Sequence, residues 1–309
     1  MVRVLLAGLP RSGTSWAGEA LGHASEVSYV DEPDGFRDAF AFRVMMRHGE
    51  NPALAKTDSA PEYERLWAGA FAGGRAPSGP GARLAQRAYL SVETSARQKA
   101  RAGQGVAPAL RIAQRFARPP EALPNACHVL VKSVQCARSL DWIHQRFEPR
   151  IVILLRNPLN ALASWRDLGF VGSPQENADF ADEAQQRWGV SPPTADAPPL
   201  AHQAFTFGVL SESLLSAADQ HPEWIVVRHE VLCGDAPNRF RELALQLGLT
   251  WTEQAETFVR ESDREGQGYA TRRVAGDQPL RWRERLSDED VDAIHGVLAQ
   301  FPRSSLTDD

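Results

Sequence analysis

The segment from Gly8 to Ser15 reads Gly-Leu-Pro-Arg-Ser-Gly-Thr-Ser and contains residue types that are suited to holding an anion. Its two glycines permit positive φ angles and close backbone approach, so successive N–H groups can converge on one anion. The hydroxyl groups of Ser12, Thr14 and Ser15 add donors, and a helix that begins here adds about half a positive charge. This pattern predicts an anion-binding loop; the alternative is an ordinary glycine-containing turn.

Three cations follow short apolar segments elsewhere in the chain: Lys132, Arg156 and Arg228. A nucleoside triphosphatase loop carries a lysine directly after its second glycine, where this chain has Thr14, and it also needs an acidic strand end to hold magnesium. Because these apolar segments end in cations, we expect protein side chains to neutralise the anion and no metal to be needed.

The elements that would position these residues can be read from the apolar pattern. Short continuous apolar runs predict buried parallel strands over 2–7, 27–30, 128–131, 151–155 and 224–227. Helical spacing predicts helices over 14–22, 158–165, 203–218, 238–247 and 288–301. The connections are too long for hairpins, so the sequence predicts an α/β fold with a parallel sheet covered by helices on both faces. Ligands of such sheets lie at the carboxyl ends of the strands, where Gly8, Lys132, Arg156 and Arg228 fall.

Length and composition are those of an ordinary globular chain. The 309 residues are 43% hydrophobic and 24% charged, and we expect a single domain over 1–309 with a helical and loop cap inserted at about 37–125. The formal charge of −5 argues against binding nucleic acid or an anionic membrane by bulk attraction.

The cysteines and the apolar segments bear on location. Three cysteines, Cys127, Cys136 and Cys233, without metal-ligand spacing favour reduced thiols in a cytoplasm. No apolar run approaches the length of a membrane span, and the early start of the glycine loop leaves no room for an anchor. We therefore expect a soluble, cytoplasmic, bacterial protein that does not associate with membranes.

Three segments together resemble a known family. Pro10-Arg11-Ser12-Gly13-Thr14-Ser15-Trp16 resembles the 5′-phosphosulfate loop of sulfotransferases that use 3′-phosphoadenosine-5′-phosphosulfate (PAPS). Arg156-Asn157-Pro158, with Ser164 eight residues after the arginine, is similar to the 3′-phosphate motif of that family. The segment 226–232, Val-Val-Arg-His-Glu-Val-Leu, is similar to a third family stretch. The resemblance spans residues 2 to about 250 and implies a P-loop-type parallel sheet with a helical cap over the acceptor site.

The resemblance also implies how the co-substrate PAPS is held. Arg11 and the backbone from Ser12 through Gly13 and Thr14 to Ser15 would bind the 5′-phosphosulfate, and Trp16 would stack on adenine, the alternative for Trp16 being core packing. Arg156 and Ser164 would bind the 3′-phosphate, with Arg156 alternatively in a rim salt bridge. A basic loop near the C-terminus would cover this end, and Arg272 and Arg273 are its candidates, although the Arg-Lys-Gly triplet of the family is absent. Tyr269 and Trp282 could line the nucleotide or pack in the core.

The acceptor hydroxyl loses a proton as it attacks sulfur, so a base is expected within hydrogen-bond reach. The cytosolic branch of the family uses a histidine shortly after the strand lysine, and here Val134 occupies that position. Glu32 resembles the catalytic glutamate of the tyrosylprotein and carbohydrate branches, with a capping or surface role as the alternative; Asp31 and His23 are further candidate bases. Lys132 and Arg11 would stabilise the charge that shifts to the leaving phosphate.

The sequence thus predicts a PAPS-dependent sulfotransferase that transfers a sulfuryl group to a hydroxyl of a small molecule or a glycan. Two alternatives stay open: a divergent P-loop kinase or nucleoside triphosphatase, and a member that binds nucleotide without turnover. The stretches 35–124 and 169–199 are expected to surround the acceptor, whose identity the sequence does not indicate.

Overall fold

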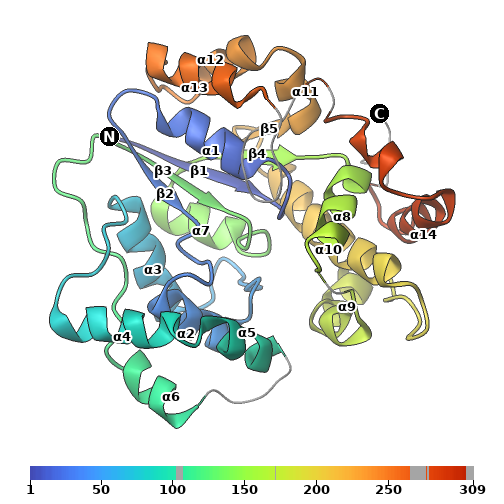
Figure 1. The fold of residues 1–309 in the computed structure, drawn as a ribbon, viewed down its shortest axis with the longest axis horizontal. Coiled ribbons are helices and arrows are strands. Elements are labelled where there is room, and N and C mark those ends of the chain that lie inside the picture. Colours follow the sequence, from blue (N-terminus) through green and yellow to red (C-terminus); the bar gives the residue numbers. More distant parts are fainter. Residues whose placement is uncertain (102–106, 171, 265–275, 277, 304–309) are drawn as a thin grey trace.

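Figure 1 shows the computed structural model of the chain, which describes residues 1–101, 107–170, 172–264, 276 and 278–303. Within these residues, five strands form one parallel sheet in the order β2-β3-β1-β4-β5. The strands are β1 (Val2–Gly8), β2 (Val27–Asp31), β3 (His128–Ser133), β4 (Arg150–Leu155) and β5 (Ile225–Arg228). All five strands were predicted from their apolar runs, each to within a residue or two of its ends.

Helices cover both faces of the sheet, so the structure confirms the predicted α/β class (Figure 1). Those of the described residues are α1 (Thr14–Gly22), α2 (Ala39–His48), α3 (Pro61–Phe71), α4 (Pro80–Leu90), α5 (Glu93–Arg101), α6 (Pro108–Gln114), α7 (Leu140–Phe147), α8 (Pro158–Asp167), α9 (Pro174–Trp188), α10 (Pro199–Ala218), α11 (His229–Gly234), α12 (Ala236–Gln246), α13 (Glu253–Ser262), the 3₁₀ helix η2 (Arg281–Glu284) and α14 (Asp288–Leu298).

The alternation of side chains along β1 builds two hydrophobic cores, one on each face of the sheet. Leu5 and Ala7 pack with residues of α2, α3, α7, α8 and α10 in the larger core. Val4 and Leu6 point the other way, into a smaller core with α1, α12 and α13. Because both faces are covered, each strand is a continuous apolar run, which is why the strands are easy to recognise in the sequence.

Helix ends agree with the sequence prediction less closely than strand ends. The helix predicted from residue 203 begins at Pro199, where proline is tolerated because the first-turn N–H groups have no partner inside the helix. The stretch 169–199, expected to be cap and loops, contains the helix α9, whose first turn is capped by the side chain of Ser173.

Lys132, Arg156 and Arg228 lie at the ends of β3, β4 and β5, whereas β2 ends in acidic residues. β2 ends in Asp31, whose partner in the register is Lys132 of β3, and Glu32 follows directly. The carboxyl edge of the sheet therefore carries acidic as well as basic groups.

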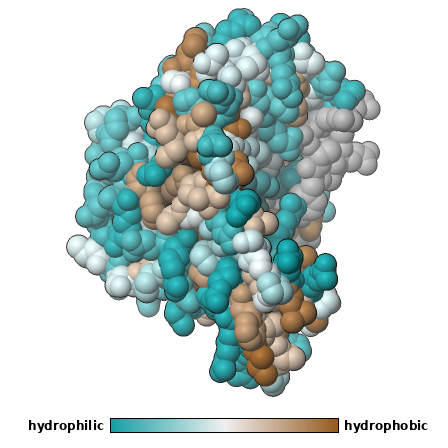
Figure 2. Space-filling view, turned by 90° about the vertical axis from the view of Figure 1, so that its left-hand side faces the viewer, coloured by the Kyte–Doolittle hydropathy of each residue, from teal (hydrophilic) through white to brown (hydrophobic). Residues whose placement is uncertain are grey.

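Helices α2 to α6 lie between β2 and β3 in the sequence, which is where the helical cap was predicted; that this segment is a cap over the acceptor stays a prediction. Several large apolar side chains of this segment are exposed, namely Leu84, Leu90, Val92, Ile112 and Phe116. Figure 2 shows apolar surface at the lower end of one face of the molecule, the end at which α6 lies in Figure 1.

None of the helices within the described residues combines the length and the apolar character that a membrane crossing needs. The three cysteines are all free thiols, Cys127 exposed and the other two buried.

Candidate active site

One of the two glycines of the loop between β1 and α1 adopts a positive φ angle. Gly13 has a φ of 93° and precedes α1, and Arg11 also lies at positive φ, 69°. Gly13 has no side chain to cap the helix, and the first turn of α1 contains no acidic residue, so nothing from these positions neutralises the amide groups. An uncapped helix N-terminus of this kind is suited to binding an anion.

The hydroxyl groups of the loop are not equivalent. Ser12 is buried, and its Oγ donates a hydrogen bond of 2.8 Å to the carbonyl of Leu9. A hydroxyl carries one proton, and the backbone N–H of Ser12 also donates to the Leu9 carbonyl, at 3.1 Å, so in this structure both donors of Ser12 stabilise the turn. Thr14 is also buried, whereas Ser15 is exposed.

A close contact explains why position 13 requires glycine. The ring of His229, which is buried, lies against Gly13, and a Cβ atom added there would lie 2.3 Å from His229 Cδ2. Burial, together with the neighbouring charge of Arg156, lowers the pKa of His229 well below its usual value, so this ring is neutral at pH 7. The loop therefore rests on an uncharged, tightly packed imidazole.

We predict that Gly13→Ala weakens binding of 3′,5′-ADP, the product nucleotide of PAPS, by at least about tenfold, since positive φ costs an alanine roughly 1–2 kcal/mol and the His229 ring blocks the methyl group. Gly49→Ala is the matched control, because Gly49 has a φ of 84° and nothing within 4 Å of its added Cβ. Calorimetric titration of both variants measures the effect. Equal affinity of Gly13→Ala and wild type would contradict the role of this loop.

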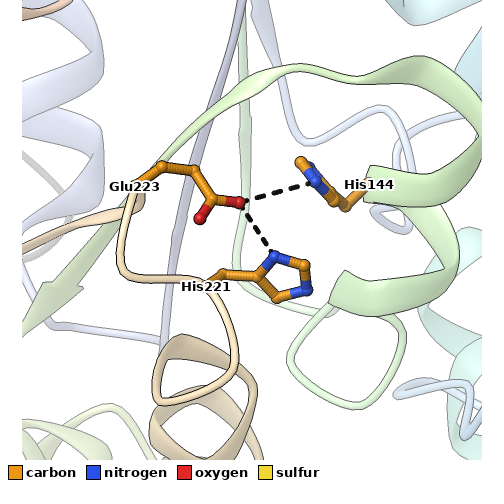
Figure 3. Close-up of side chains that lie close together, drawn as sticks. All are labelled: His144, His221 and Glu223. Atoms are coloured by element: carbon orange, nitrogen blue, oxygen red, sulfur yellow. Dashed lines mark hydrogen bonds and ion pairs between the residues drawn. The ribbon is translucent and has the colours of Figure 1, made fainter.

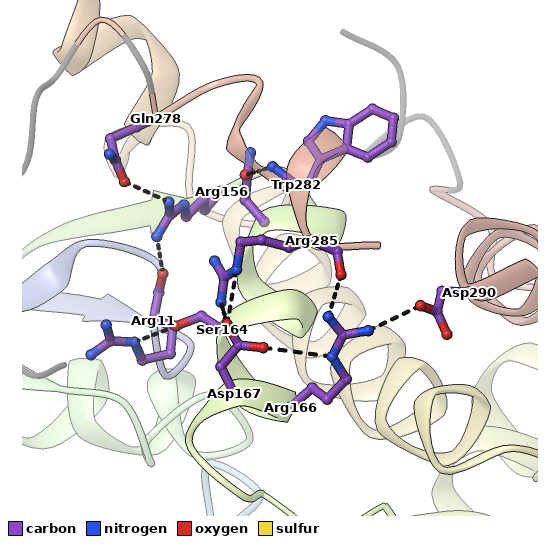
Figure 4. Close-up of polar contacts among 10 residues, drawn as sticks. Arg11, Arg156, Ser164, Arg166, Asp167, Gln278, Trp282, Arg285 and Asp290 are labelled. Atoms are coloured by element: carbon purple, nitrogen blue, oxygen red, sulfur yellow. Dashed lines mark hydrogen bonds and ion pairs between the residues drawn. The ribbon is translucent and has the colours of Figure 1, made fainter. Parts of the chain in front are cut away.

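The structure brings together Arg11, Arg156 and Ser164, three residues that the sequence predicted to share a site (Figure 4). Arg11 Nε donates to Ser164 Oγ at 2.9 Å, and Arg156 Nη1 donates to the carbonyl of Arg11 at 2.8 Å. Arg156 Nη2 donates to Gln278 Oε1 at 3.2 Å. The strand end of β4, the first helix turns of α8 and the loop after β1 thus meet at one point.

Arg156 combines burial with an unused donor. Burial lowers its pKa to about 10, with the nearby carboxylate of Glu230 acting in the opposite direction, so the guanidinium stays charged at pH 7. Its Nε is buried and has no hydrogen-bond partner among the residues that the structure describes. A buried donor without a partner costs free energy, and an anion beside it would remove that cost.

Other arginines in Figure 4 are engaged in ion pairs that hold the C-terminal segment in place. Arg285 Nη2 lies 2.7 Å from Asp167 Oδ2, and Arg166 Nη1 lies 2.9 Å from Asp290 Oδ2. Arg166 also donates to the carbonyl of Arg285. These contacts join α8 to η2 and α14, so they hold α8, which carries Ser164, in its place at the site.

Lys132, Glu32 and Asp31 form an ion-pair cluster at the ends of β2 and β3. Lys132 is 1% exposed, and its Nζ lies 2.6 Å from Glu32 Oε1 and 2.9 Å from Asp31 Oδ1. The backbone N–H of Glu32 donates to the carbonyl of Lys132, with Glu32 at positive φ, 45°. The side chains of Glu32 and Asp31 are 36% and 42% exposed, so the carboxylates reach solvent while the ammonium does not.

A third acidic group, which sequence reasoning missed, lies beside this cluster. Asp34 is buried and accepts a hydrogen bond of 2.7 Å from Ser133 Oγ, while its Oδ1 has no partner within the described part of the chain. Burial raises the pKa of Asp34 to about 7, and Glu32 acts in the same direction, whereas the Ser133 hydroxyl and Lys132 oppose it. Its position three residues after the end of β2, in Asp-Glu-Pro-Asp, is the signal that could have found it.

The raised pKa of Asp34 predicts a pH dependence of stability. Between about pH 4 and pH 7 the unfolded carboxyl group is ionised while the folded one keeps its proton, so stability falls as the pH rises through this window. Asp34→Asn cannot ionise and avoids this loss. We expect urea unfolding to show an advantage of Asp34→Asn over wild type that grows by a few kcal/mol from pH 4 to pH 7; parallel stability curves would refute the assignment.

No model of a known protein family matches this chain, and none of the curated proteins matches it. Solved structures do match. The sulfotransferase domain of the olefin synthase from Synechococcus PCC 7002 superposes with a TM-score of 0.50 and 13% identity, over 96% of this chain and 94% of that domain. The chain has the sulfotransferase fold. At this identity the likeness establishes the fold alone.

Two further structures with the sulfotransferase fold are less similar to this chain. The sulfotransferase domain from the curacin biosynthetic pathway has a TM-score of 0.46 at 12% identity, over 96% of both chains. Mouse sulfotransferase SULT7A1, solved in complex with PAP, has a TM-score of 0.42 at 10% identity, over 99% of this chain and 86% of that one.

The remaining predicted residues differ in how they lie relative to this site. Trp16 is buried in the smaller core, where its Nε1 donates to Ser262 Oγ at 2.7 Å and its ring meets Phe240 edge-on. This is the packing alternative of the sequence analysis, and adenine stacking by Trp16 stays a prediction. His23 lies at the far end of α1, against Phe258, about 13 Å along the helix from the loop.

Of the four C-terminal residues predicted to lie near the nucleotide, the structure describes one. Arg272, Arg273 and Tyr269 lie outside the described residues. The backbone N–H of Trp282 donates to Asn160 Oδ1 at 3.0 Å, and its ring packs against the larger core.

Two residues after β5 support the site and were quoted in the sequence analysis without a role. Besides His229, which packs under Gly13, Glu230 accepts a hydrogen bond of 2.9 Å at Oε1 from the backbone N–H of Asn157. Both follow Arg228 in the third segment of the family resemblance, which was the available signal.

Proposed function

We propose that this protein is a PAPS-dependent sulfotransferase that transfers a sulfuryl group to an acceptor hydroxyl. The observation that carries the proposal is that the uncapped loop, Arg11, Arg156 and Ser164 converge at one edge of the sheet, in a chain with the sulfotransferase fold. The buried Lys132 and its partner Glu32 lie at the same edge. This reaction needs two groups that bind the two phosphate ends of the co-substrate. It also needs a base for the acceptor proton and a cation beside that base.

The loop and the two arginines fit a nucleotide that carries phosphate at both its 5′ and 3′ positions. The amide groups of residues 12–15 and Arg11 would hold the 5′-phosphosulfate, while Arg156 and Ser164, with Arg272 and Arg273, would hold the 3′-phosphate. The uncapped helix N-terminus and the buried Arg156 Nε without a partner are the features that support this fit.

In the proposed reaction the acceptor oxygen attacks sulfur, and the bond between sulfur and the bridging phosphate oxygen breaks. Glu32 accepts the proton that the acceptor hydroxyl loses. Lys132 and Arg11 stabilise the negative charge that moves to the phosphate of the departing 3′,5′-ADP. The 2.6 Å contact between Lys132 Nζ and Glu32 Oε1 supports this assignment, because the reaction needs a carboxylate and a cation close together.

The acceptor proposed here is a small molecule or a glycan, bound between the carboxyl edge of the sheet and the segment that contains α2 to α6. The proposed reaction needs no metal, because Lys132 and Arg11 supply the positive charge. The net charge of −5 argues against a nucleic acid as partner, and we propose a cytoplasmic location on the strength of the three free thiols.

Isothermal titration with 3′,5′-ADP in the absence of magnesium tests the proposal. We expect saturable binding by wild type, binding at least about tenfold weaker by Arg11→Ala, and wild-type binding by Arg241→Ala, an arginine that pairs with Glu256 away from the site. Absence of binding at millimolar nucleotide would overturn the proposal.

Titration with Mg·ATP and a single-turnover assay distinguish the two alternative functions. Binding and hydrolysis of Mg·ATP in preference to 3′,5′-ADP would indicate a P-loop kinase or nucleoside triphosphatase instead. Binding of 3′,5′-ADP with no single turnover of labelled PAPS in mixed acceptor pools would indicate a nucleotide-binding protein without transferase activity.

A further inference from the structure

A cluster of metal-ligand side chains lies at the opposite edge of the sheet from the candidate active site. His144 belongs to α7, which precedes β4, and His221 and Glu223 lie in the connection that leads from α10 into β5. Because β4 and β5 are parallel neighbours, their amino ends share one edge, and the loop after β1 lies at the other. The cluster is therefore separate from the sulfuryl-transfer site.

The three side chains converge on one point (Figure 3). Glu223 Oε1 lies 2.9 Å from His221 Nδ1 and 3.8 Å from His144 Nε2, and the three candidate ligand atoms all lie within 4.8 Å of one another. Ligand atoms around a tetrahedral zinc ion are about 3.3 Å apart, given bond lengths of about 2.0 Å. Closing to that spacing takes small rotations of the side chains, of which Glu223 is the most exposed.

The hydrogen bonds of His221 orient it as metal-binding histidines are oriented. Its Nε2 lies 2.9 Å from Asp141 Oδ1, so a proton on Nε2 directs the lone pair of Nδ1 toward Glu223 and His144. Trp224 stacks on the ring at 4.2 Å with an interplanar angle of 4°, which fixes its plane. A carboxylate–histidine pair aimed at two further ligands is the arrangement that supports zinc sites.

The electrostatics of the cluster leave a place for a cation. Both nitrogens of His221 face carboxylate oxygens, Nε2 that of Asp141 and Nδ1 that of Glu223. A neutral imidazole has one proton, which can serve only one of these two contacts. The contact between Nδ1 and Glu223 therefore needs a further positive charge. A second proton on His221 or a metal ion would provide this positive charge.

We propose that His144, His221 and Glu223 bind one Zn²⁺ ion, through Nε2, Nδ1 and a carboxylate oxygen, with water as the fourth ligand and Asp141 as the residue that positions His221. The ion joins α7 to the segment that enters β5. His144 Nδ1 has no hydrogen-bond partner among the described residues, unlike His221 Nε2, so we expect micromolar affinity rather than that of a fully supported structural site.

The test measures zinc binding by untagged protein after removal of metals with a chelator. A Cys127→Ser background removes the exposed thiol, which could bind zinc by itself. Competition with a chromophoric chelator is expected to give one Zn²⁺ per chain, and excess zinc is expected to raise the melting temperature by a few degrees. Replacement of zinc by Co²⁺ is expected to give the visible absorption of a tetrahedral site.

The variants separate a built site from adventitious binding. His221→Asn and Glu223→Gln are expected to abolish the one-equivalent binding, Asp141→Asn to weaken it about 10–100-fold, and His295→Asn, on α14, to leave it unchanged. Absence of saturable binding, or binding that survives His221→Asn, would overturn the proposal. Titration with 3′,5′-ADP is unaffected in either case, so the outcome is independent of the proposed transferase function.

Discussion

Replacing Glu32 by glutamine is expected to lower sulfuryl transfer by about 10²–10⁴-fold while leaving the affinity for 3′,5′-ADP within a few-fold of wild type. Glutamine keeps the size of the side chain but cannot accept the proton of the acceptor hydroxyl. The fold is expected to tolerate the change, because Lys132 keeps its contact of 2.9 Å with Asp31. The measurement is single-turnover transfer from labelled PAPS to an acceptor found by its mass gain of one sulfuryl group.

Asp31→Asn is the matched control for Glu32→Gln. Asp31 contacts the same ammonium group but is also hydrogen-bonded to Tyr29, at 3.1 Å, and its side chain is the more exposed of the two carboxylates. We expect Asp31→Asn to retain most of the turnover. The reverse result, with Glu32→Gln active and Asp31→Asn inactive, would make Asp31 the base.

Lys132→Met is expected to lower turnover by about 10²–10³-fold, the cost of losing one positioned donor to the developing charge, or about 3–4 kcal/mol. Methionine fills a similar volume in the buried position of Lys132. The carboxylates left behind are 36% and 42% exposed, so water can solvate them and the protein is expected to stay folded.

Lys56→Met makes the same chemical change away from the site, since Lys56 pairs with Asp141 at 3.4 Å and is 46% exposed. It is expected to leave turnover unchanged. Circular dichroism of both variants verifies folding before the rates are compared. Wild-type turnover by folded Lys132→Met would exclude Lys132 from the reaction.

The strands and the loop could be predicted from the sequence because their signals are local. A parallel strand buried on both faces is a continuous apolar run, as 151–155 is, and the loop is marked by two glycines between a strand and a helix. That Arg156 and Ser164 lie at one place, each in contact with Arg11, was predictable for a related reason, since both lie on one strand–helix unit, eight residues apart.

The contacts that shape the site could not be read in the same way, because they depend on tertiary packing. The ring of His229 lies under Gly13, more than two hundred residues away, and Asp34 gains its partner Ser133 when β2 pairs with β3. Trp16 also depends on tertiary packing. The family resemblance of its motif implies adenine stacking, whereas in the structure the ring is packed in the core and donates to Ser262. Helices such as α5 are short and polar, and nothing in their sequence fixes their packing.

A crystal structure of the protein with 3′,5′-ADP would show whether the loop and the two arginines bind the phosphates of the nucleotide. We predict the 5′-phosphate on the amide groups of residues 12–15 beside Arg11, and the 3′-phosphate within hydrogen-bond distance of Arg156 and Ser164. The nucleotide bound at any other place, with Arg11 and Arg156 not contacting its phosphates, would contradict this prediction.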